Sequence, residues 1–323
     1  MVAFLVAAIF FLDSGCALPA QSTGPGGYSR AEYVLPPDIR GKTLTYGDVK
    51  IPIERKDVAE RVVEQINYLL MDRRATMMGW FDRTAVYGPL IQGVLKDEKM
   101  PPDLVYLAAL LSDFMPNAVT RSGGVGWWTL GALKEKQAPA VAKWVSNNDW
   151  DDRRDPVLST RIVSGIFQWL LGRKETSNFL IAVCAYVDGT EPVEAAVKKA
   201  PGYLYWDMVM PTTSEAMIPR LVALKIIDQN RKFYGVYNDA PPPLAFDVLD
   251  RLKPAKDLPL HVVADWCRTV PRSMWELNPG VDPAGAALPK PDPKNPAGYS
   301  LRVPKGYGIK VRPLLIKEGY LTE

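Results

Sequence analysis

The sequence has 323 residues, of which 47% are hydrophobic and 23% charged, and its formal net charge is +3 at pH 7. This is the composition of an ordinary globular protein, with enough length for one large domain and a smaller one. It contains no long run of Lys or Arg, which argues against the clustered basic surface that nucleic-acid-binding proteins carry. We therefore expect no nucleic acid among its partners.

The N-terminus has the pattern of an export signal. Residues 1–12 are apolar throughout, a run too short to span a bilayer but typical of the core of a signal peptide. The next residues, Leu12-Asp13-Ser14-Gly15-Cys16, resemble a bacterial lipoprotein signal, in which the cysteine receives lipid after cleavage. We therefore expect residues 1–16 to be a signal peptide with its lipidation site, and Cys16 to anchor the protein to a membrane. The expected location is the periplasm, as an outer-membrane lipoprotein.

The chain after the signal divides into a tether, a helical region and a different C-terminal region. Residues 17–50 are rich in Gly, Pro and Ser and predict a flexible tether. Val58, Val62 and Ile66 recur at helical spacing, and residues 51–240 predict a mainly α-helical domain without a convincing strand. The helices are expected at residues 80–98 with an interruption at Gly88-Pro89, 104–114, 133–145, 159–171, 178–187, 191–199 and 214–227.

A domain boundary is expected near residue 240. Pro and Gly punctuate residues 241–298, and apolar and polar residues alternate, as in strands, at residues 299–303 and 309–312. Within the two regions, Cys184 and Cys267 each lie in an apolar helical pattern. An oxidising compartment would permit a disulfide between them, although buried free thiols are the commoner outcome. No spacing indicates a metal site, and we expect no cofactor.

Six segments in chain order carry a family resemblance. They are Trp80-Phe81-Asp82-Arg83, Pro102-Asp103-Leu104, Ser112-Asp113-Phe114, Gly123-Gly124-Val125-Gly126-Trp127-Trp128, Asp152-Arg153-Arg154-Asp155-Pro156 and Ala185-Tyr186. Together they resemble the lysozyme-like soluble-lytic-transglycosylase (SLT) domain of the membrane-bound lytic murein transglycosylase D family, over about residues 50–230. The resemblance implies a mainly α fold and peptidoglycan glycan strands as the substrate class.

The resemblance also implies a catalytic glutamate directly before Ser112, and this chain has Leu111 there. The acid protonates the glycosidic oxygen, and an apolar setting raises its pKa so that it can donate near neutral pH. A leucine cannot transfer a proton. Asp113 lies two positions further, about 200° around a helix, so we expect it to face away from the cleft and not to substitute.

Other positions depart from the family in the same way. Thr129, Val187, Thr213 and Met217 stand where the family has Gln, Asn, Glu and Tyr, which line the sugar subsites or orient the acid. This joint loss predicts that catalysis is absent. The candidate glycan-binding residues are Ser112, Thr120, Trp127, Trp128, Thr129, Tyr186 and Met217. The alternative for these side chains is that they persist because they pack.

The C-terminal region has a second resemblance. The segments Leu260-His261-Val262-Val263-Ala264-Asp265-Trp266, Trp275-Glu276-Leu277-Asn278-Pro279-Gly280 and Leu301-Arg302-Val303 resemble a LysM module. Such a module packs two short helices against a two-stranded sheet and binds N-acetylglucosamine chains. The Gly-Asp-Thr opening of those modules is absent, so a degenerate module that only packs is an equal alternative.

Three functions follow from the sequence. The first is a catalytically degenerate envelope lipoprotein that binds peptidoglycan or serves as a structural subunit of an envelope complex. The second is an active lytic transglycosylase that forms 1,6-anhydro-muropeptides with an acid from elsewhere. The third is a protein-binding scaffold with no affinity for glycan. The lost cleft positions favour the first and the third.

Overall fold

The computed structural model describes residues 33–321, apart from 238 and 292–297 and apart from the side chains of Arg40 and Leu133. The predicted signal peptide, Cys16 and the first half of the predicted tether lie outside the described residues. Residues 33–321 belong to a single compact unit, and the description below concerns that unit.

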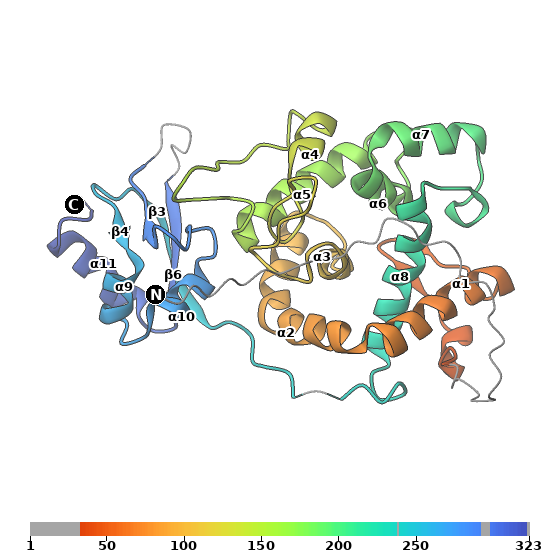
Figure 1. The fold of residues 1–323 in the computed structure, drawn as a ribbon, viewed down its shortest axis with the longest axis horizontal. Helices are drawn as coiled ribbons and strands as arrows, with labels where there is room; N and C mark the ends of the chain where they lie inside the picture. Colours follow the sequence, from red (N-terminus) through yellow and green to blue (C-terminus); the bar gives the residue numbers. More distant parts are fainter. Residues whose placement is uncertain (1–32, 238, 292–297, 322–323) are drawn as a thin grey trace, which may run out of the picture. The chain divides into compact units, whose positions relative to one another are not determined.

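The region up to residue 229 is helical, as the sequence predicts (Figure 1). Its α-helices are α1 (Lys56–Asn67), α2 (Arg74–Asp97), α3 (Leu104–Ser112), α4 (Ala132–Gln137), α5 (Pro156–Leu171), α6 (Phe179–Asp188), α7 (Thr190–Lys199) and α8 (Thr212–Gln229). Shorter turns are η1 (Pro37–Gly41), η2 (Tyr68–Asp72) and η3 (Tyr205–Asp207). The only strands described in this region are β1 (Thr45–Tyr46) and β2 (Val49–Lys50), which pair antiparallel.

The prediction of a flexible tether is wrong for residues 33–50. Leu35, Ile39, Leu44 and Tyr46 are buried in the main hydrophobic cluster, so this segment is folded. The Tyr46 hydroxyl also donates a hydrogen bond to the Asp103 carbonyl oxygen at 3.0 Å. The Gly, Pro and Ser content of the segment suggested a linker. Its apolar residues are too widely spaced to form a helical or strand pattern in the sequence, but they still pack into the core.

Three predicted helix boundaries also need correction. Helix α2 runs through Gly88 and Pro89 without interruption, and packing of its buried residues against α5 and α3 holds it together despite the missing proline N–H. Helix α4 ends at Gln137 rather than near 145, because Pro139 disfavours the helical conformation at Ala138. Helix α3 ends at Ser112, before the predicted end at Phe114.

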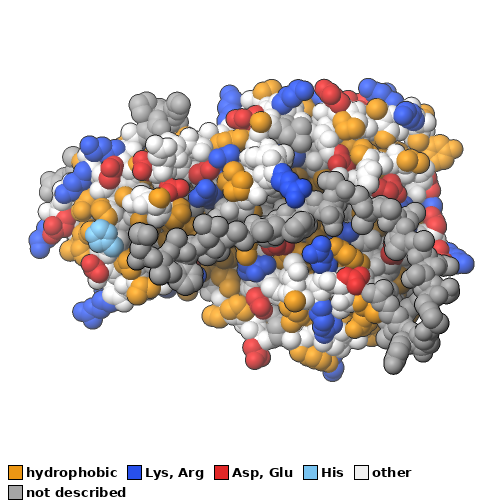
Figure 2. All heavy atoms as spheres, in the orientation of Figure 1, with side chains coloured by type: hydrophobic (Ala, Val, Ile, Leu, Met, Phe, Trp, Pro, Cys, Tyr) orange, Lys and Arg blue, Asp and Glu red, His pale blue; other side chains and the backbone are white. Residues whose placement is uncertain are grey.

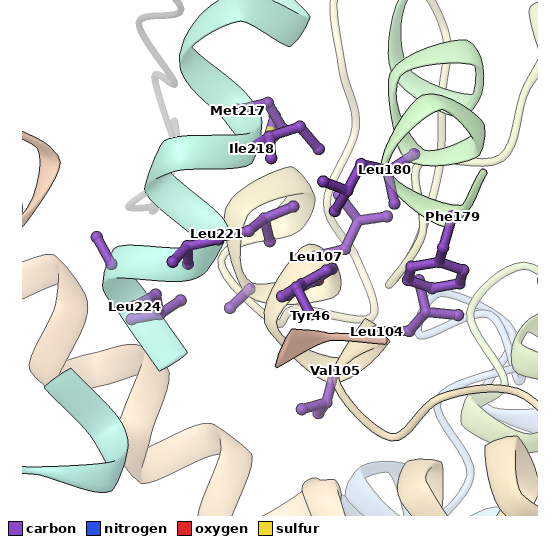
Figure 3. Packing of buried hydrophobic residues seen from close by; sticks show 14 of the residues in the cluster. Tyr46, Leu104, Val105, Leu107, Phe179, Leu180, Met217, Ile218, Leu221 and Leu224 are labelled. Carbon is purple, nitrogen blue, oxygen red and sulfur yellow. The ribbon is translucent and has the colours of Figure 1, made fainter. Parts of the chain in front are cut away.

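Helix α3 lies in the middle of the main core. In Figure 3, Leu107 of α3 lies close to Leu180 of α6, and Leu104 lies beside Phe179. These side chains are almost completely buried, as are nearly all of the apolar residues of α6. Each Å² of buried apolar area contributes about 25 cal/mol to the free energy of unfolding, so the packing of α3 stabilises the domain. Because the helix is packed in this way, a polar group at its end has a fixed position.

The C-terminal region is built from β3 (Phe246–Leu252), α9 (Leu260–Trp266), α10 (Pro271–Leu277), β6 (Tyr299–Pro304) and α11 (Gly308–Lys317). Strands β3 and β6 pair antiparallel, and the two-residue strands β4 (Leu258–Pro259) and β5 (Ala287–Leu288) form a second small pair. The alternation at residues 309–312 predicted a strand, which is wrong. Gly308, Val311 and Leu315 form the buried face, and their three-to-four spacing is that of a helix.

A second hydrophobic cluster fills this C-terminal region, and it includes one residue of the helical region, Trp150. The Asp151 N–H donates to the Gly280 carbonyl at 2.8 Å, and the Asp282 N–H donates to the Asp149 carbonyl at 2.8 Å. The loop before α5 is thus part of the C-terminal core. Cys184 lies in the first cluster and Cys267 in the second, and both are free thiols, so they do not form a disulfide.

A buried ion pair also joins the two regions. Arg302 of β6 bonds both carboxylate oxygens of Asp155, at 2.6 and 3.1 Å, and the two side chains are 3% and 1% exposed. The same Asp155 carboxylate caps α5 by accepting from the N–H groups of Val157 and Leu158. Asp155 is therefore both a helix cap and the acidic half of an inter-region pair.

The charged surface is mixed. On the face shown in Figure 2, Lys and Arg side chains are interspersed with Asp and Glu rather than gathered into one basic area. Among the described helices, none combines the length and the apolar character needed to cross a bilayer.

Candidate functional site at the end of α3

The candidate site lies at the C-terminal end of α3. The resemblance implies a catalytic glutamate at one residue there and a serine at the next. Leu111 and Ser112 occupy the last positions of the helix. Asp113 and Phe114 then adopt left-handed conformations, with φ of 54° and 57°. Two consecutive non-glycine residues in this region are uncommon and are typical of functional sites whose surroundings hold the backbone in place.

Ser112 fastens this helix end to the loop that follows. Its side chain is buried, and its hydroxyl lies 2.9 Å from the carbonyl of Ala108 and 2.8 Å from the carbonyl of Trp127. The hydroxyl has a single hydrogen, so it donates to one of the two carbonyls at a time. The role of Ser112 in this structure is thus to connect α3 to the glycine loop.

The glycine loop depends on its glycines. Gly126 has a φ of +77°, and a Cβ at this position would lie 1.9 Å from the carbonyl oxygen of Arg153. Thr120 supports the same turn, because its hydroxyl accepts from the Gly124 N–H at 2.8 Å. Thr129 has a φ of 51°, which is a third non-glycine residue in the left-handed region close to this site. The turn therefore has a structural requirement for its sequence.

The aromatic candidates are interior side chains. Trp127, Trp128 and Tyr186 are 0% exposed. The indole N–H of Trp127 donates to the Arg154 carbonyl at 2.6 Å, and that of Trp128 lies 3.1 Å from the Thr160 hydroxyl. Rings buried in this way present no free face on which a sugar could stack.

Tyr186 is fixed on every side. Its hydroxyl donates to the Trp128 carbonyl at 2.6 Å, and its ring stacks on Phe167 with centroids 5.2 Å apart. Burial raises the pKa of the Tyr186 phenol. Tyr186 and Ser112 therefore bond neighbouring carbonyls of one loop, so the C-terminal ends of α3 and α6 lie on the same side of the domain.

Five positions depart from the family's polar set. Leu111, Thr129 and Val187 are partly buried and keep some contact with solvent, and Thr213 is exposed. Met217 is almost buried, and it lies with Ile218 close to Leu180 in the packed interior between α8 and α6 (Figure 3). None of the five side chains has a titratable group, so none of them can supply the proton that a general acid donates.

Comparison with known proteins agrees with this arrangement. Residues 89–209 match the family model of the transglycosylase SLT domain, a stretch that contains α3, the glycine loop and α6. The chain carries a lytic-transglycosylase-like SLT domain.

Two curated relatives are similar to part of the chain. Both are named membrane-bound lytic murein transglycosylase D, one from Escherichia coli strain K12 and one from E. coli O6:H1. Each is 30% identical over 161 residues, which is 48% of this chain and 34% of the relative. The chain therefore spans about a third of the length of the curated relatives that it matches.

The position of Asp113 in the SLT domain differs from the prediction. The helical-wheel argument assumed a helix through Phe114, but Asp113 lies beyond the end of α3 in a left-handed conformation, so the 200° argument does not apply. Its carboxylate accepts from the Trp80 indole N–H at 2.7 Å, and its carbonyl accepts from Arg83 Nε at 2.6 Å. Burial lowers the pKa of the Arg83 guanidinium. Asp113 is held by these partners at the helix end.

Sequence reasoning missed one titratable residue of the SLT domain, Lys134 on α4. Its side chain is buried, and its amine lies 4.0 Å from the centre of the Tyr186 ring. Burial lowers the pKa of this amine to about 7, and the charge of Asp188 partly opposes that shift. The adjacent Gln137 has a buried side-chain oxygen without a hydrogen-bond partner. Lysine in a short polar helix gives no periodic signal, so the sequence did not reveal this burial.

The acidic, histidine and cysteine side chains of the described residues are not clustered as metal ligands would be. Within residues 33–321, leaving aside 238 and 292–297, no three His, Cys, Asp or Glu side chains are grouped so as to hold a metal ion. A surface hollow lined by Gln92, Gly93, Lys96, Lys99, Met100 and Pro102 contains none of the residues that the sequence selects.

Proposed function

We propose that this chain is a catalytically degenerate lytic-transglycosylase-like protein of the cell envelope. In this proposal it holds peptidoglycan, or serves as a structural subunit of an envelope complex, without cutting glycan. The observation that carries the proposal is Leu111 at the end of α3, directly before a Ser112 that bonds the glycine loop. The hydrogen bond between this helix end and the glycine loop is present, whereas the position at which the resemblance implies the acid is apolar.

The remaining acidic and basic groups do not replace the acid in this proposal. The Asp113 carboxylate accepts from Trp80 and stays within a framework of fixed donors. Lys134 titrates near neutral pH, but its amine is buried against the Tyr186 ring. A general acid must come within hydrogen-bond reach of the leaving oxygen, and a buried amine cannot approach a polymeric glycan without movement of α4.

Retained glycan contact is supported by the side chains that stay partly open to solvent. Leu111, Thr129 and Val187 surround the ends of α3 and α6 and could touch a glycan strand through apolar and hydroxyl contacts. The buried rings of Trp127, Trp128 and Tyr186 are not included in this surface. A surface without stacking aromatic rings or charged groups predicts weak affinity.

Co-sedimentation with purified sacculi tests this surface. The variant Val187→Trp should reduce the bound fraction, because a bulky ring at this position would obstruct the strand. The control is Val270→Trp, at an exposed position of the C-terminal region. Binding that falls equally in both variants contradicts the assignment of the surface, and no binding by the unmodified chain supports the protein-binding scaffold instead.

The scaffold is a second candidate because part of the expected hollow is filled. Met217 packs with Ile218 toward Leu180, so its side chain occupies space where the family has a tyrosine (Figure 3). Apolar replacement of a polar cleft closes the cleft or creates a seat for a partner's side chain. This candidate predicts that sacculi bind the chain no better than an unrelated globular protein does.

We propose that the C-terminal region is a LysM-like module that acts mainly by packing. The order β3, α9, α10, β6, with β3 antiparallel to β6, supports the resemblance. Asn278 of the Leu-Asn-Pro-Gly segment is buried, and its amide bonds both the N–H and the carbonyl of Arg302 at 2.7 Å. An amide used in this way holds the module together and is not available to a sugar.

We propose a membrane-anchored location in the cell envelope. The apolar run at residues 1–12 and the lipoprotein-like Leu12-Asp13-Ser14-Gly15-Cys16 support export and lipidation. The names of the two curated relatives describe those proteins as membrane-bound. Under this proposal the SLT domain faces the peptidoglycan from an anchor at Cys16.

A further inference from the structure

Helix α11 presents an apolar and basic face to solvent. Its buried face consists of Gly308, Val311 and Leu315. On the outside, Ile309 is 89% exposed and Ile316 is 37% exposed. Isolated exposed apolar residues are normal on protein surfaces, but two β-branched residues on one short helix form a defined stripe.

The basic residues of α11 lie beside this stripe. Ile309 and Ile316 are seven positions apart, which is about two helical turns, so they lie above one another. Lys310 and Lys317 have the same spacing and form a parallel stripe, and Pro313 lies between the two stripes. The outward face of α11 is therefore apolar along one side and cationic along the other.

Helix α11 contains no Asp or Glu, and the ion pairs described for residues 33–321 do not include Lys310, Arg312 or Lys317. The Lys310 amine lies 4.8 Å from the centre of the Tyr307 ring, which leaves its charge in place. Lys256 adds a further positive charge at the end of the helix, because its amine donates to the Glu318 carbonyl at 3.0 Å. Two acidic residues lie close to α11 but outside it. Glu318 follows the last residue of the helix, and Asp247 forms its ion pair with Lys305, which precedes the helix.

We infer that α11 is a membrane-surface contact that adsorbs to bilayers containing anionic lipid. A helix with basic residues beside an exposed apolar stripe lies in the plane of the interface, with the stripe below the headgroups and the cations among them. A bilayer with anionic lipid offers both partners at the same surface: the headgroups attract the lysines, and the acyl layer accommodates the isoleucines. An acidic protein surface offers the charge without the apolar layer, and it forms the competing outcome of the test.

This contact is independent of the SLT domain's glycan surface, because α11 belongs to the C-terminal core. It gives a lipid-anchored chain a second attachment. One lipid chain alone gives only marginal and reversible membrane binding, and a second signal converts it into stable association. The inference does not require Cys16 to be lipidated, and it is testable on residues 33–323, which form one compact unit.

Vesicle flotation tests the inference with residues 33–323. The chain should float with vesicles of phosphatidylcholine and phosphatidylglycerol but not with phosphatidylcholine alone, and salt should weaken the association. The double variant Lys310→Gln/Lys317→Gln should lower the partition coefficient by roughly 10–30-fold. The double variant Ile309→Ser/Ile316→Ser should lower it by about tenfold or more.

Matched control variants separate the α11 face from general effects. Val209 is 90% exposed, so Val209→Ser removes an equally exposed apolar side chain elsewhere. Lys143→Gln/Lys199→Gln removes two exposed lysines of the SLT domain region. These controls should float like the unmodified chain. No flotation with anionic vesicles, or equal losses in the controls and the α11 variants, overturns the inference, as does equal flotation with neutral vesicles.

Discussion

Ser112 and Tyr186 lie within hydrogen-bond distance of consecutive carbonyl oxygens, those of Trp127 and Trp128, at 2.8 and 2.6 Å. The ends of α3 and α6 are thereby fixed to one glycine loop. Leu111 lies beside this loop, directly before Ser112, at the position where the resemblance implies a catalytic glutamate.

The Tyr186 hydroxyl is predicted to act structurally. Tyr186→Phe removes the donor to the Trp128 carbonyl and leaves a buried acceptor unpaired, so the free energy of unfolding should fall by about 1–3 kcal/mol. Urea unfolding followed by circular dichroism measures this change. As a control, Tyr237→Phe at an exposed position should alter stability by less than about 0.5 kcal/mol. Equal stabilities of the two variants would contradict the structural role.

Lys134 is predicted to destabilise the fold below neutral pH. Its folded pKa of about 7 lies below the usual 10.5, so the unfolded chain binds more protons between these values. The free energy of unfolding therefore rises with pH between about 7 and 10.5. Below about pH 7 the whole cost of burying the charged amine is present. Lys134→Met should raise the free energy of unfolding by several kcal/mol at pH 6, on the order of 1.4 kcal/mol per tenfold change in proton affinity.

At pH 10.5 the stabilities of Lys134→Met and the unmodified chain should come close together, because the amine is then neutral in the folded state and half neutral in the unfolded state, which leaves little of the penalty. The control is Lys136→Met, an exposed residue of the same helix, which should show no such pH dependence. A gain for Lys134→Met that is the same at both pH values would point to packing rather than to a buried charge.

The ion pair between Asp155 and Arg302 is predicted to be essential for joining the two regions. Asp155→Ala leaves the Arg302 guanidinium buried without its carboxylate and removes the α5 cap, so it should cost about 3–5 kcal/mol of stability. Chemical unfolding of the whole chain provides the measurement. The exposed pair of Arg272 and Glu276 is the reference: Glu276→Ala should cost no more than about 1 kcal/mol. Comparable costs at the two pairs would be inconsistent with the buried geometry.

Anchoring is predicted to depend on Cys16. Cys16→Ser should transfer the protein from the membrane fraction to the soluble periplasmic fraction, because the lipid acceptor is gone. Fractionation of cells that express each form is the measurement. The α11 contact predicts that a residual portion stays on anionic membranes at low salt and is released by salt. Full retention that resists salt would mean that the lipoprotein signal was misassigned or that a partner holds the chain.

The sequence was most informative where a regular pattern coincided with buried packing. The apolar spacing of α1 and the segment at residues 299–303 predicted a helix and a strand that the structure contains. The segment at residues 309–312 failed because a short stretch of alternation is compatible with both periods. Its helical spacing becomes visible only when Gly308 and Leu315 are included.

The candidate residues could be named from the family resemblance, but their surroundings could not be predicted. The structure brings Ser112 and Tyr186 to neighbouring carbonyls of one loop. The burial of Trp127 and Lys134 depends on contacts from distant segments, and no local pattern encodes these contacts. The same is true of Asp113, whose left-handed conformation ended the helix earlier than apolar spacing indicated.

Restoring the acid alone is predicted to be insufficient. Leu111→Glu places a carboxyl group at the end of α3, but Thr129, Val187 and Met217 lack the amide, carboxyl or phenol groups that would orient it or the sugar. Normal turnover of peptidoglycan should therefore not appear in this variant. Release of anhydro-muropeptides at the rate of an active transglycosylase would show that the other positions matter little.

The most direct test of the central claim is digestion of purified sacculi by the unmodified chain, followed by detection of 1,6-anhydro-muropeptides. The account predicts no release above a buffer blank, because Leu111 cannot donate a proton and the family's other polar positions are lost. Reproducible release that disappears in Asp113→Asn would contradict it, since Asp113 would then be acting as the acid.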